Sequence, residues 1–317
     1  MQRDQDGTRL SLMADRFEVA GAHLLPLARA EAACIEALGR RFEAQSGGCT
    51  VVWRCWGAGP GVVLLHGGSG GWNHWIRNVQ AIAAKGFTVL APDMPGYGDS
   101  GDAPQPHGTA SLASVMMHGL RDSAERPEAL ERQDAPLIIV GFSFGGAVAA
   151  QWARQEGRRL AGLVLVGAMG LGGGRDPGVR MRPWKDVEDA QQFLAIQRHN
   201  LGALMFHDQQ RIDALALGLH LRNTAMTRFV SKWISRSDEA LAVLPELDAP
   251  LHGIWGEHDV TAPGGASQRE MKLKAVSPGA GFDIIADAGH WVQYEQADRF
   301  NQTMLAALDA LAARAVR

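Results

Sequence analysis

A short tract near the middle of the chain constrains its fold more than any other feature. Residues 138–140 are apolar, and the sequence Gly-Phe-Ser-Phe-Gly follows at 141–145, ahead of an alanine-rich stretch. An apolar strand that runs into Gly-X-Ser-X-Gly and then into a helix is typical of a nucleophile elbow, in which a tight turn exposes a serine hydroxyl. The tract therefore predicts a strand, a turn and a helix, with Ser143 as a candidate nucleophile.

The composition is that of a globular protein with one large core. Of the 317 residues, 46% are hydrophobic and 21% are charged, and the net charge of −3 provides no basic field for nucleic acid. The first residues lack the apolar region of a signal peptide, and no apolar run of 18 residues occurs. We therefore expect a cytoplasmic protein with a small-molecule substrate and no nucleic-acid or membrane partner; a homodimer is left open.

Short apolar runs alternate with helical stretches along most of the chain. The runs lie at 50–56, 62–65, 87–91, 137–141, 160–166, 250–255 and 282–285. The helical stretches lie at 72–84, 111–130, 146–155 and 298–313. Continuous apolar strands separated by helices indicate a parallel sheet that is covered on both faces. We therefore expect an α/β fold with a mostly parallel central sheet of about eight strands.

Two segments do not follow this alternation. Residues 1–48 begin with a polar stretch and continue with apolar residues at helical spacing over 21–43, which predicts a helix docked on the body. Residues 169–247 open with several glycines and continue with apolar residues at helical spacing, which predicts an inserted helical lid. The core is then made of 49–168 and 248–317.

A serine hydroxyl needs a neighbouring base, and that base must be oriented by a third group. Asp259 follows the run at 250–255, and His290 follows the run at 282–285. Both lie just after a strand, at the carboxyl edge of the sheet where open α/β sheets bind ligands. The chain order serine, acid, histidine is the one that an elbow of this kind requires. We expect Ser143, Asp259 and His290 to form a catalytic triad.

The same chemistry requires donors for the oxyanion that forms when a carbonyl is attacked. The backbone amide of Phe144, directly after the serine, is the first candidate. The second lies in the glycine-rich loop 66–71, and we select Gly68 because glycines let the main chain turn its amides inward. We expect His66, in the same loop, to order the loop by hydrogen bonding.

Motifs for cofactors and metals are poorly supported. The tract 96–101 has the form Gly-X-Gly-X-X-Gly, but Pro95 separates it from the preceding strand and prolines follow where a helix should begin. No phosphate-binding loop of the Gly-X-X-X-X-Gly-Lys type and no His-Glu-X-X-His motif occurs. The adjacent residues at 257–259 point in different directions. We therefore expect neither a cofactor nor a metal.

Taken together, these motifs resemble the α/β-hydrolase superfamily, in its lid-bearing serine hydrolase branch. The resemblance covers about 49–311 and includes the turn at 66–68, the segment 93–100, the elbow and the pair Gly289-His290. It implies the α/β-hydrolase fold, with the segment 93–100 as a structural turn.

Within the superfamily, the tracts 72–78 and 289–301 resemble the hydrolases that cleave carbon–carbon bonds in meta-cleavage products of aromatic degradation. Those enzymes usually carry Asn immediately before the serine, where this chain has Phe142, and they hold the substrate carboxylate with an arginine of the lid. Arg211 and Arg222 are candidate counterparts. The expected substrate-binding residues are Trp72, Phe142, Trp291 and Arg211.

Our prediction from the sequence is a serine hydrolase that cleaves a small carboxylic ester through an acyl-enzyme on Ser143. The alternative is a C–C bond hydrolase that acts on a vinylogous 1,5-diketone. A hydrolase-like ligand receptor with negligible turnover is an alternative from another class. Residues of the lid are expected to line the pocket and to decide the substrate.

Overall fold

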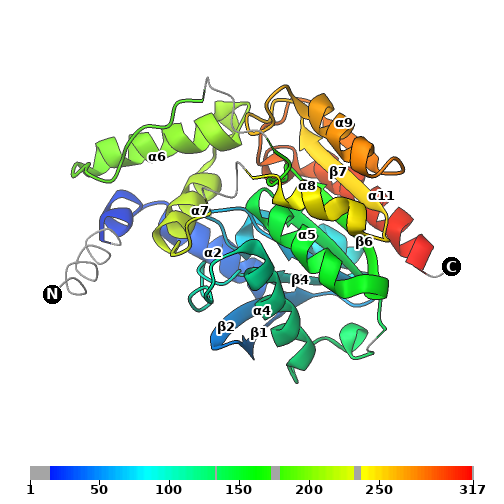
Figure 1. The fold of residues 1–317 in the computed structure, drawn as a ribbon. Helices are drawn as coiled ribbons and strands as arrows, with labels where there is room; N and C mark the ends of the chain where they lie inside the picture. The colour runs from blue at the N-terminus through cyan, green and yellow to red at the C-terminus, as the bar shows by residue number, and fades with distance from the viewer. Residues whose placement is uncertain (1–14, 133, 173–178, 232–236, 316–317) are drawn as a thin grey trace.

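The computed structural model describes residues 15–132, 134–172, 179–231 and 237–315 (Figure 1). Its centre is an eight-stranded sheet with the order β1-β2-β4-β3-β5-β6-β7-β8. The strands are β1 Arg40–Ser46, β2 Cys49–Trp56, β3 Gly61–Leu65, β4 Thr88–Pro92, β5 Leu137–Phe142, β6 Leu160–Val166, β7 Leu251–Gly256 and β8 Gly281–Ile285. β2 pairs antiparallel with β1 and β4, and all other pairs are parallel. The prediction of a mostly parallel sheet of about eight strands is confirmed.

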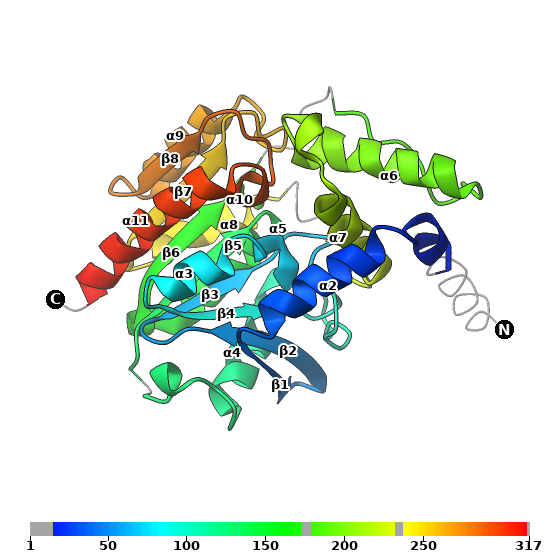
Figure 2. The ribbon, with the colours of Figure 1, turned by 180° about the vertical axis from the view of Figure 1, so that it is seen from behind.

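Helices cover both faces of the sheet, and each face has its own apolar core. One core contains buried residues of α4 Thr109–Asp122, α5 Phe144–Glu156, α8 Glu239–Val243 and α9 Ala266–Val276. The other contains buried residues of α2 Leu25–Glu36, α3 Val79–Ala84, α10 Val292–Glu295 and α11 Ala297–Ala315. Figures 1 and 2 show these two layers from opposite sides. The short 3₁₀ turns are η1 Trp72–Trp75, η2 Glu128–Leu130, η3 Gly157–Arg159, η4 Gln209–Arg211 and η6 Leu244–Glu246.

The helix predicted over 21–43 is too long. α2 ends at Glu36, and β1 follows with buried Phe42 and Ala44 alternating with exposed residues. This period of two suits a strand, and the two glycines at 47–48, both with positive φ, turn the chain back so that β1 pairs with β2. The sheet therefore includes Arg40–Ser46, which belong to the N-terminal segment 1–48 and not to the predicted core.

Two other predicted helices are interrupted. The stretch 72–84 consists of η1 and α3, and the stretch 111–130 consists of α4 and η2. In the second case Pro127 stands before η2, where the residue preceding a proline avoids helical geometry.

The segment 169–247, predicted to be a lid, contributes α6 Ala190–Met205 and α7 Ala214–Ala225, which lie at the carboxyl ends of the strands. Each helix starts at an aspartate that caps it: Asp189 accepts from the amide of Gln192, and Asp213 accepts from that of Ala216. α8, within the predicted lid, packs on α5 instead. Residues 173–178 and 232–236, also within the predicted lid, lie outside the described residues.

The N-terminal segment is tied to the lid rather than to the sheet alone. α2 packs against α7, and the close approach is made at Gly218, where a Cβ atom would lie 2.7 Å from the carbonyl oxygen of Leu24. Figure 2 shows the two helices side by side. Among the described helices, none combines the length and apolar character needed to cross a bilayer.

Candidate active site

Ser143 lies in the turn between β5 and α5. Its φ of +53° is in the left-handed region, which is unusual for a residue other than glycine. The flanking glycines are required by crowding: a Cβ at Gly141 would lie 2.4 Å from the carbonyl oxygen of Gly145, and one at Gly145 would lie 2.4 Å from that of His66. The turn therefore presses the serine against the loop that follows β3.

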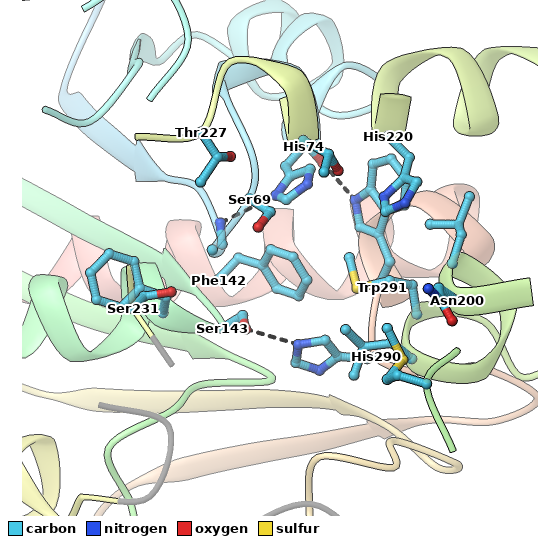
Figure 3. A pocket seen from close by; sticks show the side chains of 18 of the residues that line it. Ser69, His74, Phe142, Ser143, Asn200, His220, Thr227, Ser231, His290 and Trp291 are labelled. Atoms are coloured by element: carbon cyan, nitrogen blue, oxygen red, sulfur yellow. Dashed lines mark hydrogen bonds between the residues drawn. The ribbon is translucent and has the colours of Figure 1, made fainter. Parts of the chain in front are cut away.

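The structure brings Ser143, His290 and Asp259 into one chain of hydrogen bonds. His290 Nε2 lies 2.9 Å from Ser143 Oγ, and His290 Nδ1 lies 2.9 Å from Asp259 Oδ2 (Figure 3). All three side chains are buried. Because the parallel strands β5, β7 and β8 point the same way, the residues that follow them meet at one edge of the sheet. In this arrangement the imidazole can take the proton of the serine hydroxyl.

Thr261 also belongs to this chain, and the sequence analysis missed it. Its amide and its hydroxyl both donate to Asp259 Oδ1, at 2.8 and 2.7 Å. The hydroxyl oxygen also lies 3.0 Å from His290 Nδ1. The signal was present in the sequence, because an Asp with Thr two residues later commonly closes a turn through its own side chain. Thr261 leaves Asp259 Oδ2 free for the imidazole.

Gly167, at the end of β6, is the second residue that sequence reasoning missed. Its φ is +48°, and a Cβ there would lie 3.1 Å from Asp259 Oδ2 and 3.2 Å from His290 Nδ1. Only a residue without a side chain fits beside this pair without displacing it.

The two candidate oxyanion donors lie on segments that touch. Phe144 is the first residue of α5, and a Cβ at Gly68 would lie 3.7 Å from that of Phe144. The neighbouring amide of Gly67 is already used, because it donates to His74 Nδ1 at 3.2 Å. Among the described residues, no group accepts from the amides of Gly68 or Phe144. This arrangement leaves both N–H groups available beside the serine.

His66 has both ring nitrogens engaged within its loop. Nδ1 lies 2.8 Å from the carbonyl oxygen of Gly67, and Nε2 accepts from the amide of Met94 at 2.9 Å. Burial lowers the pKa of His66 to about 4, so the ring is neutral. These bonds order the loop in the way that the sequence suggested.

The turn that starts at Asp93 supports the same loop. The buried Asp93 pairs with Arg54 at 2.7 Å and accepts from the amides of Trp72 and Asp99 at 2.8 and 3.0 Å. Burial alone would raise the pKa of Asp93, but Arg54, His66 and these amides outweigh burial and lower it. The Asp93 carboxylate therefore stabilises the turn and the loop, and it does not contact Ser143.

A cavity of about 440 Å³ opens beside Ser143 and His290, between the sheet edge and the lid. Phe142 and Trp291, two of the expected substrate-binding residues, line it. Apolar side chains from the core and the lid dominate the rest, among them Met169, Leu201, Leu204, Met205, Phe229 and Val230. No Asp, Glu, Lys or Arg of the described residues lines the cavity. The described lining therefore carries no acidic side chain and no lysine or arginine.

Trp72 and Arg211, expected to bind substrate, lie elsewhere in the structure. Trp72 is buried with its ring 5.3 Å from that of Trp56, because its amide is held by Asp93 and its side chain turns into the core. Arg211 donates to the carbonyl oxygen of Glu295 at 3.0 Å and lies outside the cavity. The structure therefore places neither side chain at this cavity.

Arg222, the other candidate for binding a substrate carboxylate, forms an ion pair with Asp99. Its Nη2 lies 3.1 Å from Asp99 Oδ1, and it does not line the cavity.

One group of side chains on the surface has the composition of a metal site. Ligand atoms of Glu257, His258 and Asp287 lie within 4.8 Å of one another, and all three residues are exposed. Glu257 also lies 3.6 Å from His258 Nε2 and accepts from the amide of Asp287. These contacts explain why the three side chains lie close together in a surface turn. None of the three residues lines the cavity.

The fold and this site define a hydrolase of the α/β class, and comparison with known proteins agrees. Residues 62–303 match the alpha/beta hydrolase family, and the chain belongs to that family. It is 28% identical to a 2-hydroxy-6-oxo-6-phenylhexa-2,4-dienoate hydrolase of Burkholderia cepacia over 78% of this chain and 87% of that protein.

Solved structures show the same fold. A meta-cleavage product hydrolase from Pseudomonas fluorescens superposes with a TM-score of 0.67 at 23% identity, covering 85% of this chain and 97% of the other. An esterase from Rhodococcus sp. ECU1013 superposes with a TM-score of 0.65 at 21% identity, covering 86% and 99%. Proteins of both kinds that the sequence suggested therefore share this fold.

Proposed function

We propose that this protein is a serine hydrolase that cleaves carboxylic esters with uncharged substituents. The observation that carries the proposal is the buried chain from Ser143 through His290 to Asp259, at the wall of a cavity whose described lining includes no Asp, Glu, Lys or Arg. A hydroxyl in contact with an oriented imidazole is the arrangement that activates a serine.

In the proposed mechanism, Ser143 Oγ attacks the ester carbonyl while its proton passes to His290 Nε2. The carbonyl oxygen becomes an oxyanion and accepts from the amides of Phe144 and Gly68. When the intermediate collapses, His290 returns the proton to the leaving alcohol and the acyl group stays on the serine. A water molecule then attacks the acyl-enzyme, giving its proton to His290, and the acid is released as the serine regains a proton. Asp259 holds the imidazole in the tautomer that can accept at Nε2.

The described part of the lining, which includes no Asp, Glu, Lys or Arg, favours an ester over a meta-cleavage product. A 2-hydroxy-6-oxo-dienoate bears a carboxylate, and burying an unpaired carboxylate is costly. Arg211 and Arg222 are engaged outside the cavity, so neither is placed to balance that charge. An uncharged ester needs no such partner.

C–C bond hydrolysis is the second candidate, because the relative from Burkholderia cepacia carries that activity in its name and matches over most of both chains. The same serine, histidine and aspartate would serve, with a carbon leaving group in place of the alcohol. One difference from those enzymes lies at this site: Phe142 stands directly before the serine, and its ring lies 5.0 Å from that of His290.

The experiment compares turnover of phenyl acetate with that of a 2-hydroxy-6-oxo-6-phenyl dienoate, both followed spectrophotometrically. We expect steady-state turnover of the ester and at least a hundredfold lower kcat/KM for the dienoate. Ser143→Ala should lower ester turnover by about 10⁴-fold or more, because removing a triad member disables the whole unit. Ser114→Ala, on the exposed side of α4, is the control.

Greater kcat/KM for the dienoate would replace the ester assignment by the second candidate. A single slow cycle with every substrate would instead favour a receptor.

A further inference from the structure

Four neutral polar side chains form one wall of the cavity, and each carries a hydrogen-bonding atom that no described protein group uses. They are His74 of η1, Gln197 of α6, and His220 and Thr224 of α7, and we call them the polar wall. In the view of Figure 3, His74 and His220 lie on one side of Phe142, and Ser143 and His290 lie on the other. The polar wall therefore faces the part of a substrate that is remote from the reacting bond.

His74 offers a donor. The amide of Gly67 donates to its Nδ1, so that nitrogen carries a lone pair and not a proton. Burial, together with the nearby imidazoles of His66, His220 and His290, holds the pKa of His74 well below its usual range. The ring is therefore neutral with its proton on Nε2, and Nε2 has no acceptor among the described residues.

His220 and Gln197 offer an acceptor and a second donor. His220 Nε2 lies 3.1 Å from Gln197 Oε1, and since an amide oxygen only accepts, the ring donates there and keeps a lone pair on Nδ1. Burial lowers the pKa of His220 to about 4, so the ring stays neutral. Gln197 is only 1% exposed, and its Nε2 is buried without a partner.

Thr224, one helical turn after His220, adds a hydroxyl of the same kind. Its Oγ1 is buried and unpaired in the part of the chain that the structure describes. By contrast, Asn200 lines the cavity with both ends of its amide used, by the amide and the carbonyl oxygen of Arg182. Unpaired buried polar atoms destabilise a fold. Because Gln197 and Thr224 line the cavity, a ligand bound there can reach Gln197 Nε2 and Thr224 Oγ1 and satisfy them.

We propose that the polar wall binds an uncharged hydroxyl group of the substrate, so that the preferred esters carry a hydroxyl remote from the scissile bond. A hydroxyl can accept from His74 or Gln197 and donate to His220, whereas a methyl group can do neither. A carboxylate would gain no positive partner here and would face the lone pair of His220. This inference rests on the proposed ester hydrolysis.

The test uses aryl esters whose para substituent is methyl, hydroxymethyl or carboxylate, placed on the acyl ring in one set and on the alcohol ring in the other. In one of the two sets, the wild-type protein should turn over the hydroxymethyl ester with a kcat/KM at least tenfold above that of the methyl ester. The carboxylate ester should fall below both. A site built to bind a hydroxyl discriminates strongly against the analogue that lacks it.

Substitutions in the polar wall test whether its side chains cause the preference for the hydroxymethyl ester. His220→Phe should reduce the hydroxymethyl preference to less than threefold, because the phenyl ring offers no acceptor for the hydroxyl. Thr224→Val keeps the side-chain shape and serves if His220→Phe does not fold; it should lower the preference at least twofold. His118→Phe, on the exposed face of α4, is the matched control and should keep the wild-type preference.

Binding to the Ser143→Ala protein separates this inference from the proposed function. Tighter binding of the hydroxymethyl ester by Ser143→Ala, lost in the Ser143→Ala/His220→Phe double variant, supports the polar wall even if the wild-type protein hydrolyses no ester. Hydrolysis of the series with equal kcat/KM for methyl and hydroxymethyl esters overturns the polar wall and leaves the ester hydrolase standing. A preference that persists in both His220→Phe and Thr224→Val also overturns it.

Discussion

Thr261 Oγ1 lies 3.0 Å from His290 Nδ1 while it donates to Asp259 Oδ1 at 2.7 Å. One hydroxyl therefore touches both the carboxylate and the imidazole that the carboxylate orients. With the Thr261 amide on the same oxygen, Asp259 is held from one side and presents its other oxygen to the ring.

We expect Thr261→Val to lower kcat about tenfold with KM unchanged, because a hydrogen bond to a charged group is worth about 1.5–3 kcal/mol. Valine keeps the shape but cannot donate to Asp259. Steady-state kinetics with an aryl ester measure the effect, and Thr261→Ser should restore most of the rate. A rise in KM at constant kcat would show that Thr261 acts on binding instead.

Gly167→Ala should lower kcat at least tenfold, because the new methyl group would press on Asp259 and His290. Gly157 is the matched control: its φ is +57°, yet nothing lies within 4 Å of a Cβ there. Both alanine variants should lose about 1–2 kcal/mol of stability from the left-handed backbone, as measured by urea unfolding. Equal activities of the two variants would show that the absence of a side chain at Gly167, beside Asp259 and His290, does not affect catalysis.

Stability should fall as the pH drops from about 6.5 towards 4. Burial holds the pKa of His66 at about 4 in the folded state, whereas an unfolded histidine titrates near 6.5. Between these values the unfolded chain binds the additional proton, so the free energy of unfolding decreases with falling pH, by about 3 kcal/mol from this residue at pH 4. His66→Asn should flatten the slope of urea-unfolding free energy against pH by close to one proton. An unchanged slope would show that His66 does not contribute.

Arg222→Gln should change kcat/KM for neutral and for carboxylate-bearing esters by the same factor. Arg222 is engaged by Asp99, which also contacts Arg54, so its charge serves to hold α7 on the core. We expect a loss of about 0.5–1 kcal/mol in stability, in the range of partly exposed ion pairs. A loss confined to carboxylate esters would instead place Arg222 on the substrate.

Much of the fold could be predicted because its signals are local. The strand before Ser143, the turn glycines and the alanine-rich helix are contiguous, and each apolar run that alternates with a helix predicted a strand of the parallel sheet. The N-terminal helix was overextended because Leu38 and Phe42 continue a helical spacing, although Phe42 and Ala44 also suit a strand. Pairing with β2, a tertiary contact, decides between the two readings.

The direction of a side chain was much harder to predict than its position along the chain. Trp72 and Arg211 lie in segments that border the site, yet the indole of Trp72 packs in the core and the guanidinium of Arg211 binds a carbonyl oxygen outside the cavity. Thr261 and Gly167 escaped notice because their importance depends on what lies beside them.

By itself, the sequence determined the strand order along the chain, the elbow and the candidates that follow the strand ends, since these depend on neighbours a few residues away. The tertiary structure alone decided that Ser143, His290 and Asp259 meet at 2.9 Å, that no charged residue of the described lining faces the cavity, and that the polar wall forms. Ser143 and His290 alone are 147 residues apart in the chain. Packing of the sheet and lid brings them together, and no local pattern encodes that packing.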